Sequence, residues 1–123
     1  MFHISTGDDG LVRVAVHGRL TGADYESFVP EFERMMARMR GRVPMLIELA
    51  PDFAGWNCDA LWRDLEFGLA HRRDFERVAV VGDKAWEEWA IKLFAPFFRA
   101  DIRYFGRSDR EAARAWASAG KPH

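Results

Sequence analysis

The fold of this chain is decided by the stretch VAVVGD at residues 78–83. The four apolar residues 78–81 show no polar alternation, which is typical of a strand buried on both faces of a parallel sheet. Gly82 and Asp83 then end the strand and begin a segment with apolar residues at helical spacing. A buried strand followed directly by a helix predicts an α/β domain with a mostly parallel sheet.

Strand-like and helix-like segments alternate on both sides of this stretch. Short apolar runs predict five strands, at residues 1–5, 11–17, 45–49, 78–81 and 102–105. Apolar residues at helical spacing predict about four helices, at residues 21–39, 57–69, 83–98 and 108–119. The order ββαβαβαβα predicts a mixed, mostly parallel five-stranded sheet covered by these helices. The length of 123 residues suits a single domain spanning residues 1–123.

Local signals mark two of the helix starts and one interruption. Thr21 is followed three residues later by Asp24, and Ser108 by Glu111, so each pair predicts a capping box. In the first helix, Pro30 removes a backbone donor, so we expect a kink or restart near residues 27–30 before the main helix.

Charge and cysteine content limit the possible partners and compartment. The formal net charge is -1, with acidic residues interleaved among the arginines, which argues against nucleic-acid binding. The lone Cys58 excludes an internal disulfide and fits a reducing compartment. The chain does not open with a signal peptide, and no apolar run approaches the roughly 20 residues that span a bilayer. These features predict a cytoplasmic protein without a membrane span.

The aromatic content of 14%, with ten Phe and five Trp, is high for a small domain. In the third predicted helix, one broad face gathers Trp86, Trp89, Ala90, Leu93 and Phe97, and the opposite side gathers Lys84, Glu87, Glu88 and Lys92. Further apolar residues, Ile91, Phe94 and Phe98, extend beyond the stripe that a core-facing helix needs. Three interpretations stay open: a bulky core with a bend near Pro96, a homodimer face, or the wall of an apolar ligand pocket.

No pattern in the sequence predicts catalysis or metal binding. Cys58 at a helix start would need a base to act as a nucleophile, and His71 lies on the far side of that helix. The four histidines lack ligand spacing, and glycine-rich phosphate loops are absent. The carboxylates around the second helix are typical of solvated faces and caps. We therefore predict a protein that is not an enzyme and needs no metal or cofactor.

Four segments together resemble one bacterial family, the SpoIIAA-like family, which is grouped with STAS and SEC14 domains. They are residues 52–56, residues 75–83 with Trp86, residues 102–105, and residues 111–112 with Trp116. The resemblance implies a STAS-like fold. In STAS domains of the anti-sigma-factor antagonist type, phosphorylation of a serine in the loop before the second helix switches binding to a partner protein. The corresponding residues 53–59 contain no serine or threonine, so the standard switch is not expected here. SEC14-type domains instead bury a lipid or another apolar ligand.

The leading hypothesis is a non-catalytic STAS/SEC14-like binding domain for an apolar or lipid-like small molecule. Its aromatic-lined site would lie between residues 53–62 and the helix at 86–98, and backbone amides at the second helix's start would hold a polar head group. The alternative is a protein-interaction module that binds a regulatory protein through the same surface, and a homodimer is compatible with both. The predicted site residues are Phe53, Trp56, Asn57, Cys58, Trp62, Trp86, Trp89, Phe94 and Phe97.

Overall fold

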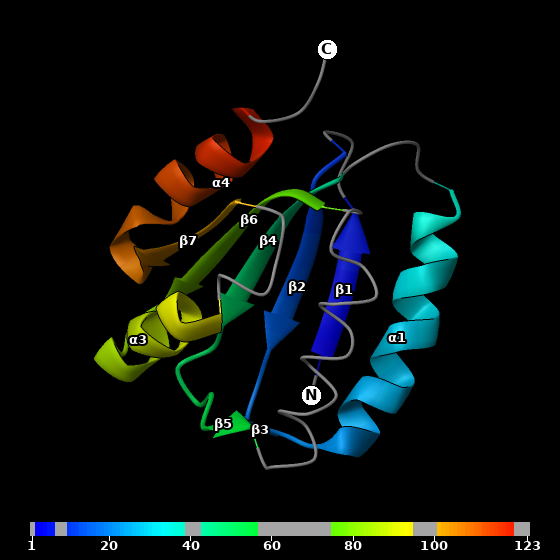
Figure 1. Cartoon of the computed structure of the whole chain (residues 1–123), viewed down its shortest axis with the longest axis horizontal. Coiled ribbons are helices and arrows are strands. Elements are labelled where there is room, and N and C mark those ends of the chain that lie inside the picture. Colours follow the sequence, from blue (N-terminus) through cyan, green and yellow to red (C-terminus); the bar gives the residue numbers. More distant parts are fainter. Residues whose placement is uncertain (1, 7–9, 39–42, 57–74, 95–100, 120–123) are drawn as a thin grey trace.

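A computed structural model of the chain describes residues 2–6, 10–38, 43–56, 75–94 and 101–119, and its main feature is a five-stranded sheet (Figure 1). The strands lie in the order β1-β2-β4-β6-β7. Only β1 is antiparallel to its neighbour; the other pairs are parallel. The predicted mixed, mostly parallel sheet is therefore confirmed. Its strands are β1 Phe2–Thr6, β2 Val12–Val16, β4 Val43–Leu49, β6 Phe75–Gly82 and β7 Asp101–Gly106.

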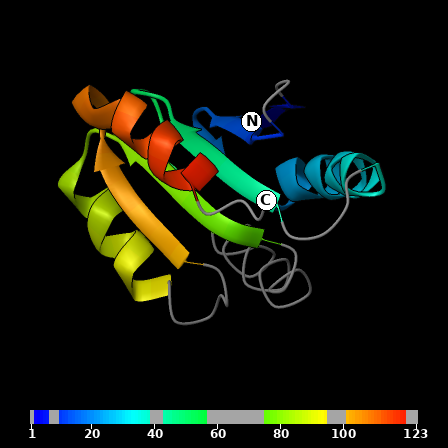
Figure 2. The same ribbon diagram turned by 90° about the horizontal axis from the view of Figure 1, so that it is seen from above.

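Within the described residues, three α-helices cover the two faces of this sheet. α4 lies over one face, and α1 and α3 lie on the other (Figure 2). β6 supplies both cores because its side chains alternate: Val78 and Val80 pack on the α1 side, whereas Ala79 and Val81 pack against α4. All four residues are buried, as their unbroken apolar sequence predicts. The helices are α1 Gly22–Met36, α3 Ala85–Phe94 and α4 Arg110–Ala119.

α1 begins where the sequence predicts but is not interrupted. The Thr21 side chain accepts from the backbone of Asp24, and the Asp24 carboxylate accepts from the backbone of Thr21, which completes the predicted capping box. The predicted restart near residues 27–30 is wrong, because one helix continues through Pro30. Burial of Phe28 and Phe32 in the core offsets the backbone hydrogen bond that proline removes.

A second, very small sheet was not predicted from the sequence. β3 (Arg19–Leu20) pairs in parallel with β5 (Gly55–Trp56), next to the start of α1. Gly55 has a φ of 99°, a conformation that favours glycine over any other residue. This pairing positions the segment after β4 at the carboxyl edge of the main sheet.

The last helix begins differently from the prediction. A short 3₁₀ helix, η2 (Arg107–Asp109), precedes α4, so Ser108 lies inside η2 and does not cap α4. The carboxylate of Glu111 accepts from Arg114 at 3.1 Å, which replaces the predicted capping box. β7 lies at one edge of the five-stranded sheet.

The predicted helix at residues 57–69 lies outside the described residues, so the count of about four helices is not confirmed. Within the described segments, no helix is long and apolar enough to cross a membrane.

Candidate functional site

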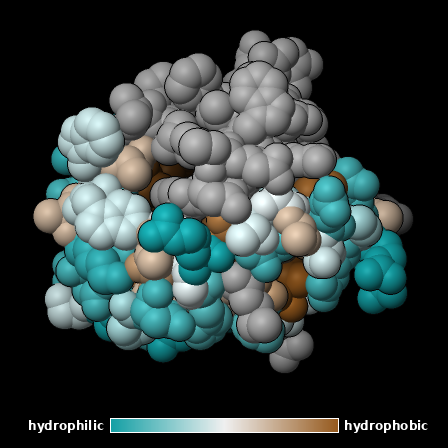
Figure 3. All heavy atoms as spheres, turned by 90° about the horizontal axis from the view of Figure 1, so that it is seen from below, coloured by the Kyte–Doolittle hydropathy of each residue, from teal (hydrophilic) through white to brown (hydrophobic). Residues whose placement is uncertain are grey.

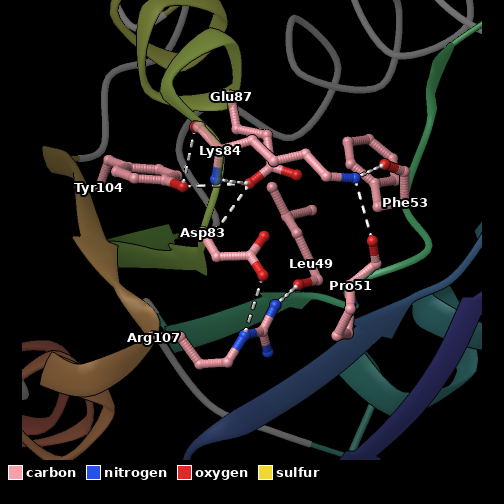
Figure 4. A network of polar contacts seen from close by, with 8 residues as sticks. All are labelled: Leu49, Pro51, Phe53, Asp83, Lys84, Glu87, Tyr104 and Arg107. Carbon is pink, nitrogen blue, oxygen red and sulfur yellow. Dashed lines mark hydrogen bonds and ion pairs between the residues drawn. The ribbon is translucent and has the colours of Figure 1, made fainter.

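The carboxyl ends of β4, β6 and β7 meet at one edge of the sheet, where a network of polar side chains lies (Figure 4). Ligands of open parallel sheets bind outside the carboxyl ends of the strands. Seen from this side, the described surface is mostly hydrophilic, and hydrophobic atoms show in small separate areas (Figure 3). The edge is therefore the first place to look for a functional site.

Glu87 is the centre of this network and is almost fully buried, with 1% of its surface exposed. Its Oε1 atom accepts three hydrogen bonds: from the backbone N–H of Asp83 (3.1 Å), from the backbone N–H of Lys84 (3.2 Å) and from the Tyr104 hydroxyl (3.0 Å). Glu87 is the third residue of α3, the position from which a glutamate reaches back to cap a helix. Among the described residues, its second oxygen, Oε2, has no hydrogen-bond partner.

Tyr104 is held in its neutral form by this environment. Burial, the hydrogen bond to Glu87 and the charge of Glu87 raise the pKa of the Tyr104 hydroxyl well above its usual range. The hydroxyl also lies 3.3 Å from the backbone oxygen of Lys84. Tyr104 therefore acts as a permanent donor and not as an acid or base near neutral pH.

The raised pKa of Tyr104 predicts a loss of stability in alkaline solution. Below roughly pH 10, both the folded and the unfolded chain keep this proton, so the stabilisation is complete. Above that pH the unfolded chain releases the proton while the folded chain retains it, so the free energy of unfolding falls as pH rises. Urea titrations at a series of alkaline pH values should show a steeper loss for the wild type than for Tyr104→Phe. Equal slopes would contradict the burial of this hydroxyl.

Two cationic side chains bind main-chain oxygens at the end of β4 and in the segment after it. The Lys84 ammonium donates to the carbonyl oxygens of Pro51 (3.0 Å) and Phe53 (2.6 Å). The Arg107 guanidinium donates through Nη2 to the carbonyl oxygen of Leu49 at 2.6 Å, and its Nε lies 3.5 Å from Asp83 Oδ2. These donors bind main-chain oxygens, so the network holds the loop in place.

An aromatic pair lies beside the polar network. Phe53 is fully buried, and its ring stacks on that of Trp86 with centroids 5.6 Å apart and planes at 21°. Gly55 faces the same indole, because a β-carbon there would lie 3.5 Å from Trp86. The Trp86 side chain remains 41% exposed. A buried ring thus supports an indole that is open to solvent on its other side.

The structure brings together two of the predicted site residues, Phe53 and Trp86. Trp89 lies on the outer side of α3 and is 67% exposed. For Trp56 and Phe94 the backbone is described, in β5 and α3, but the side chains are not. The remaining predicted residues, Asn57, Cys58, Trp62 and Phe97, lie outside the described residues.

The predicted separation of polar and apolar sides on α3 fails at Glu87, which the sequence groups with the polar side but which is buried. Trp89 belongs to the apolar face, for which the sequence leaves a core, a dimer face or a pocket wall open, and its side chain is 67% exposed. Periodicity fails here because the helix start must satisfy its backbone donors, which turns Glu87 inward and rotates the buried face toward Ala90. The position of Glu87 in the first turn of the helix is the only local signal that indicates a capping role, because Lys84 is not a capping residue. For Tyr104 and Arg107 we find no such signal.

This sheet order, with α4 on one face and α1 and α3 on the other, defines an α/β domain of the STAS class. The chain belongs to the SpoIIAA-like family, whose family model matches residues 11–118. It is similar to an uncharacterized Shewanella loihica PV-4 protein of the DUF3478 family with a SpoIIAA-like fold, whose crystal structure has been solved. The two share 28% identity and superpose with a TM-score of 0.79, covering 95% of this chain and 92% of the other. No curated protein matches the chain.

Proposed function

We propose that this chain is a non-catalytic binding domain that holds an apolar or lipid-like small molecule against Trp86 at the carboxyl edge of the sheet. The observation that carries the proposal is the stack of Trp86 on Phe53, because the indole is fixed on one side by the core and 41% exposed. A ring that is already ordered loses little conformational entropy when a ligand covers it.

The polar network supports binding over catalysis. Lys84 and Arg107 are occupied by main-chain oxygens, and the Tyr104 hydroxyl, whose pKa is raised by burial, keeps its proton. Acid–base catalysis needs a group that exchanges its proton near the working pH. Tyr104 is therefore not such a group.

The test is a thermal-shift screen of the full chain against fatty acids and phospholipids, combined with native mass spectrometry of the purified protein. A bound ligand should raise the Tm, and Trp86→Ala should weaken its binding about tenfold, equivalent to about 1.4 kcal/mol. Trp89→Ala is the matched control, since it removes an indole from the same helix without touching Phe53. Circular dichroism verifies that both variants fold. If no compound changes the Tm and no ligand copurifies with the protein, the proposal is wrong.

Trp89 favours a second candidate function, a protein-interaction module. With 67% of its surface exposed, this side chain is too open for the wall of an enclosing pocket, but it suits the centre of a protein interface. A pull-down from native extract should then recover a stoichiometric partner with the wild type and lose it with Trp89→Ala.

A further inference from the structure

The outer side of α3 carries a short ridge of exposed residues. The ridge consists of four residues. Ala85, Trp89 and Lys92 follow one another at helical spacings of four and three residues, and Glu88 lies beside them on the same side of the helix. The opposite side of the helix is used internally, since Glu87 and Ala90 are buried. The ridge therefore makes no contribution to the core.

The charges of this ridge are not satisfied within the described part of the chain. No ion pair or hydrogen bond joins the side chain of Glu88 or Lys92 to another described residue, whereas Glu111 on α4 pairs with Arg114. Between these two charges stands Trp89, whose large apolar surface faces solvent. Exposed aromatic surface rimmed by charge is typical of a protein contact.

The order of the charges along the ridge indicates which kind of protein could bind there. Glu88 precedes Lys92 by about one helical turn, and Trp89 lies between them. Along the helix axis, the ridge therefore presents a negative charge, then an indole ring, then a positive charge. When two such helices pack antiparallel about a two-fold axis, the same flank of each helix faces its copy in reverse order. Glu88 then lies opposite Lys92 of the partner subunit, and Lys92 opposite Glu88 of the partner subunit. Trp89 lies near the axis and meets Trp89 of the partner subunit.

We propose that this ridge is a homodimer contact in which two copies of α3 pack antiparallel. Parallel packing would place like charges opposite each other, so the charge pattern selects one orientation. Antiparallel helix dipoles add to the attraction. The inference rests on the second proposed function, a protein contact at Trp89, and names the partner as a second copy of this chain.

A contact through one helix per subunit is small. Stable interfaces bury about 800 Å² on each partner, and a single ridge of four residues offers less. The dimer should therefore dissociate on dilution, with monomer and dimer both present at micromolar concentration.

The test is sedimentation equilibrium of the full chain and five variants. The wild type should show a concentration-dependent dimer, and Trp89→Ala should raise its dissociation constant at least about tenfold. Glu88→Lys alone and Lys92→Glu alone should each be monomeric, because each places like charges at both contacts. An equimolar mixture of these two single variants should associate, and Glu88→Lys combined with Lys92→Glu should restore the homodimer. As a control, Glu31→Lys, an equal charge change on the exposed side of α1, should leave the dimer unchanged.

Association in the mixture would show that both single variants are folded and that each lost only its charge match. No wild-type protein is present that could account for the association. A wild type that stays monomeric up to near-millimolar concentration overturns the dimer, and so does a dimer that tolerates all these substitutions. The two proposals remain distinguishable. If the wild type is monomeric and a different stoichiometric protein is lost from pull-downs with Trp89→Ala, the protein contact stands and the second copy is excluded.

Discussion

Gly82→Ala is expected to lower the free energy of unfolding by about 3 kcal/mol, which is at the upper end for overpacking of a buried site. The reason is the position of the missing side chain. A β-carbon at Gly82 would lie 2.6 Å from the Tyr104 hydroxyl and closer still to Glu87 Oε1. Neither group can move away without breaking the hydrogen bonds that end β6 and begin α3.

The sheet offers a matched control for this substitution. Gly106 pairs directly with Gly82 across β6 and β7, and a β-carbon there would meet no atom within 4 Å. Its φ of -69° suits any residue, so Gly106→Ala should be neutral or stabilising by a few tenths of a kcal/mol. Urea denaturation followed by circular dichroism measures both changes. Similar costs for the two variants would mean that the Glu87–Tyr104 pair does not occupy the space above Gly82.

The sheet could be predicted from the sequence because its residues obey a single rule. Val12, Val14 and Val16 alternate with more exposed residues and are buried on one face, as their spacing predicts. The unbroken apolar run of β6 likewise predicts cover on both faces, and both cores are observed. In these strands the burial of apolar side chains contributes most to stability, so hydrophobicity alone assigns their faces.

The candidate site was less predictable because other interactions compete with apolar burial there. At the start of α3, hydrogen bonding of backbone donors outweighs the cost of burying a carboxylate, so Glu87 points inward and Trp89 outward. The stack of Trp86 on Phe53 depends on β5 and Gly55, a pairing of two-residue strands that leaves no periodic pattern. Tyr104 comes from β7, 17 residues after Glu87, and no local spacing relates the two. These contacts depend on the tertiary arrangement.

Glu87→Ala is expected to lower the free energy of unfolding by about 3 kcal/mol. Comparison with an exposed glutamate tests whether the buried carboxylate of Glu87 stabilises the fold. The substitution removes the acceptor of the Asp83 and Lys84 amides and of the Tyr104 hydroxyl, of which only Tyr104 has a second described acceptor, the Lys84 oxygen. Glu87→Gln keeps an oxygen in the same place, so it should cost less, about 1 kcal/mol, because the new amide nitrogen is buried.

Glu111→Ala provides the comparison, since Glu111 also lies in the first turn of a helix but is 81% exposed and pairs with Arg114 alone among the described residues. Its loss should change stability by no more than about 0.5 kcal/mol. Thermal and urea unfolding of the three variants should therefore rank Glu111→Ala nearest the wild type, then Glu87→Gln, then Glu87→Ala. If Glu87→Gln proves as costly as Glu87→Ala, then the negative charge of Glu87 stabilises the start of α3 more than the geometry of its Oε1 hydrogen bonds does. If Glu87→Ala is as mild as Glu111→Ala, the buried network does not hold the carboxyl edge together, and the support of Trp86 by the segment after β4 must come from the Phe53 stack alone.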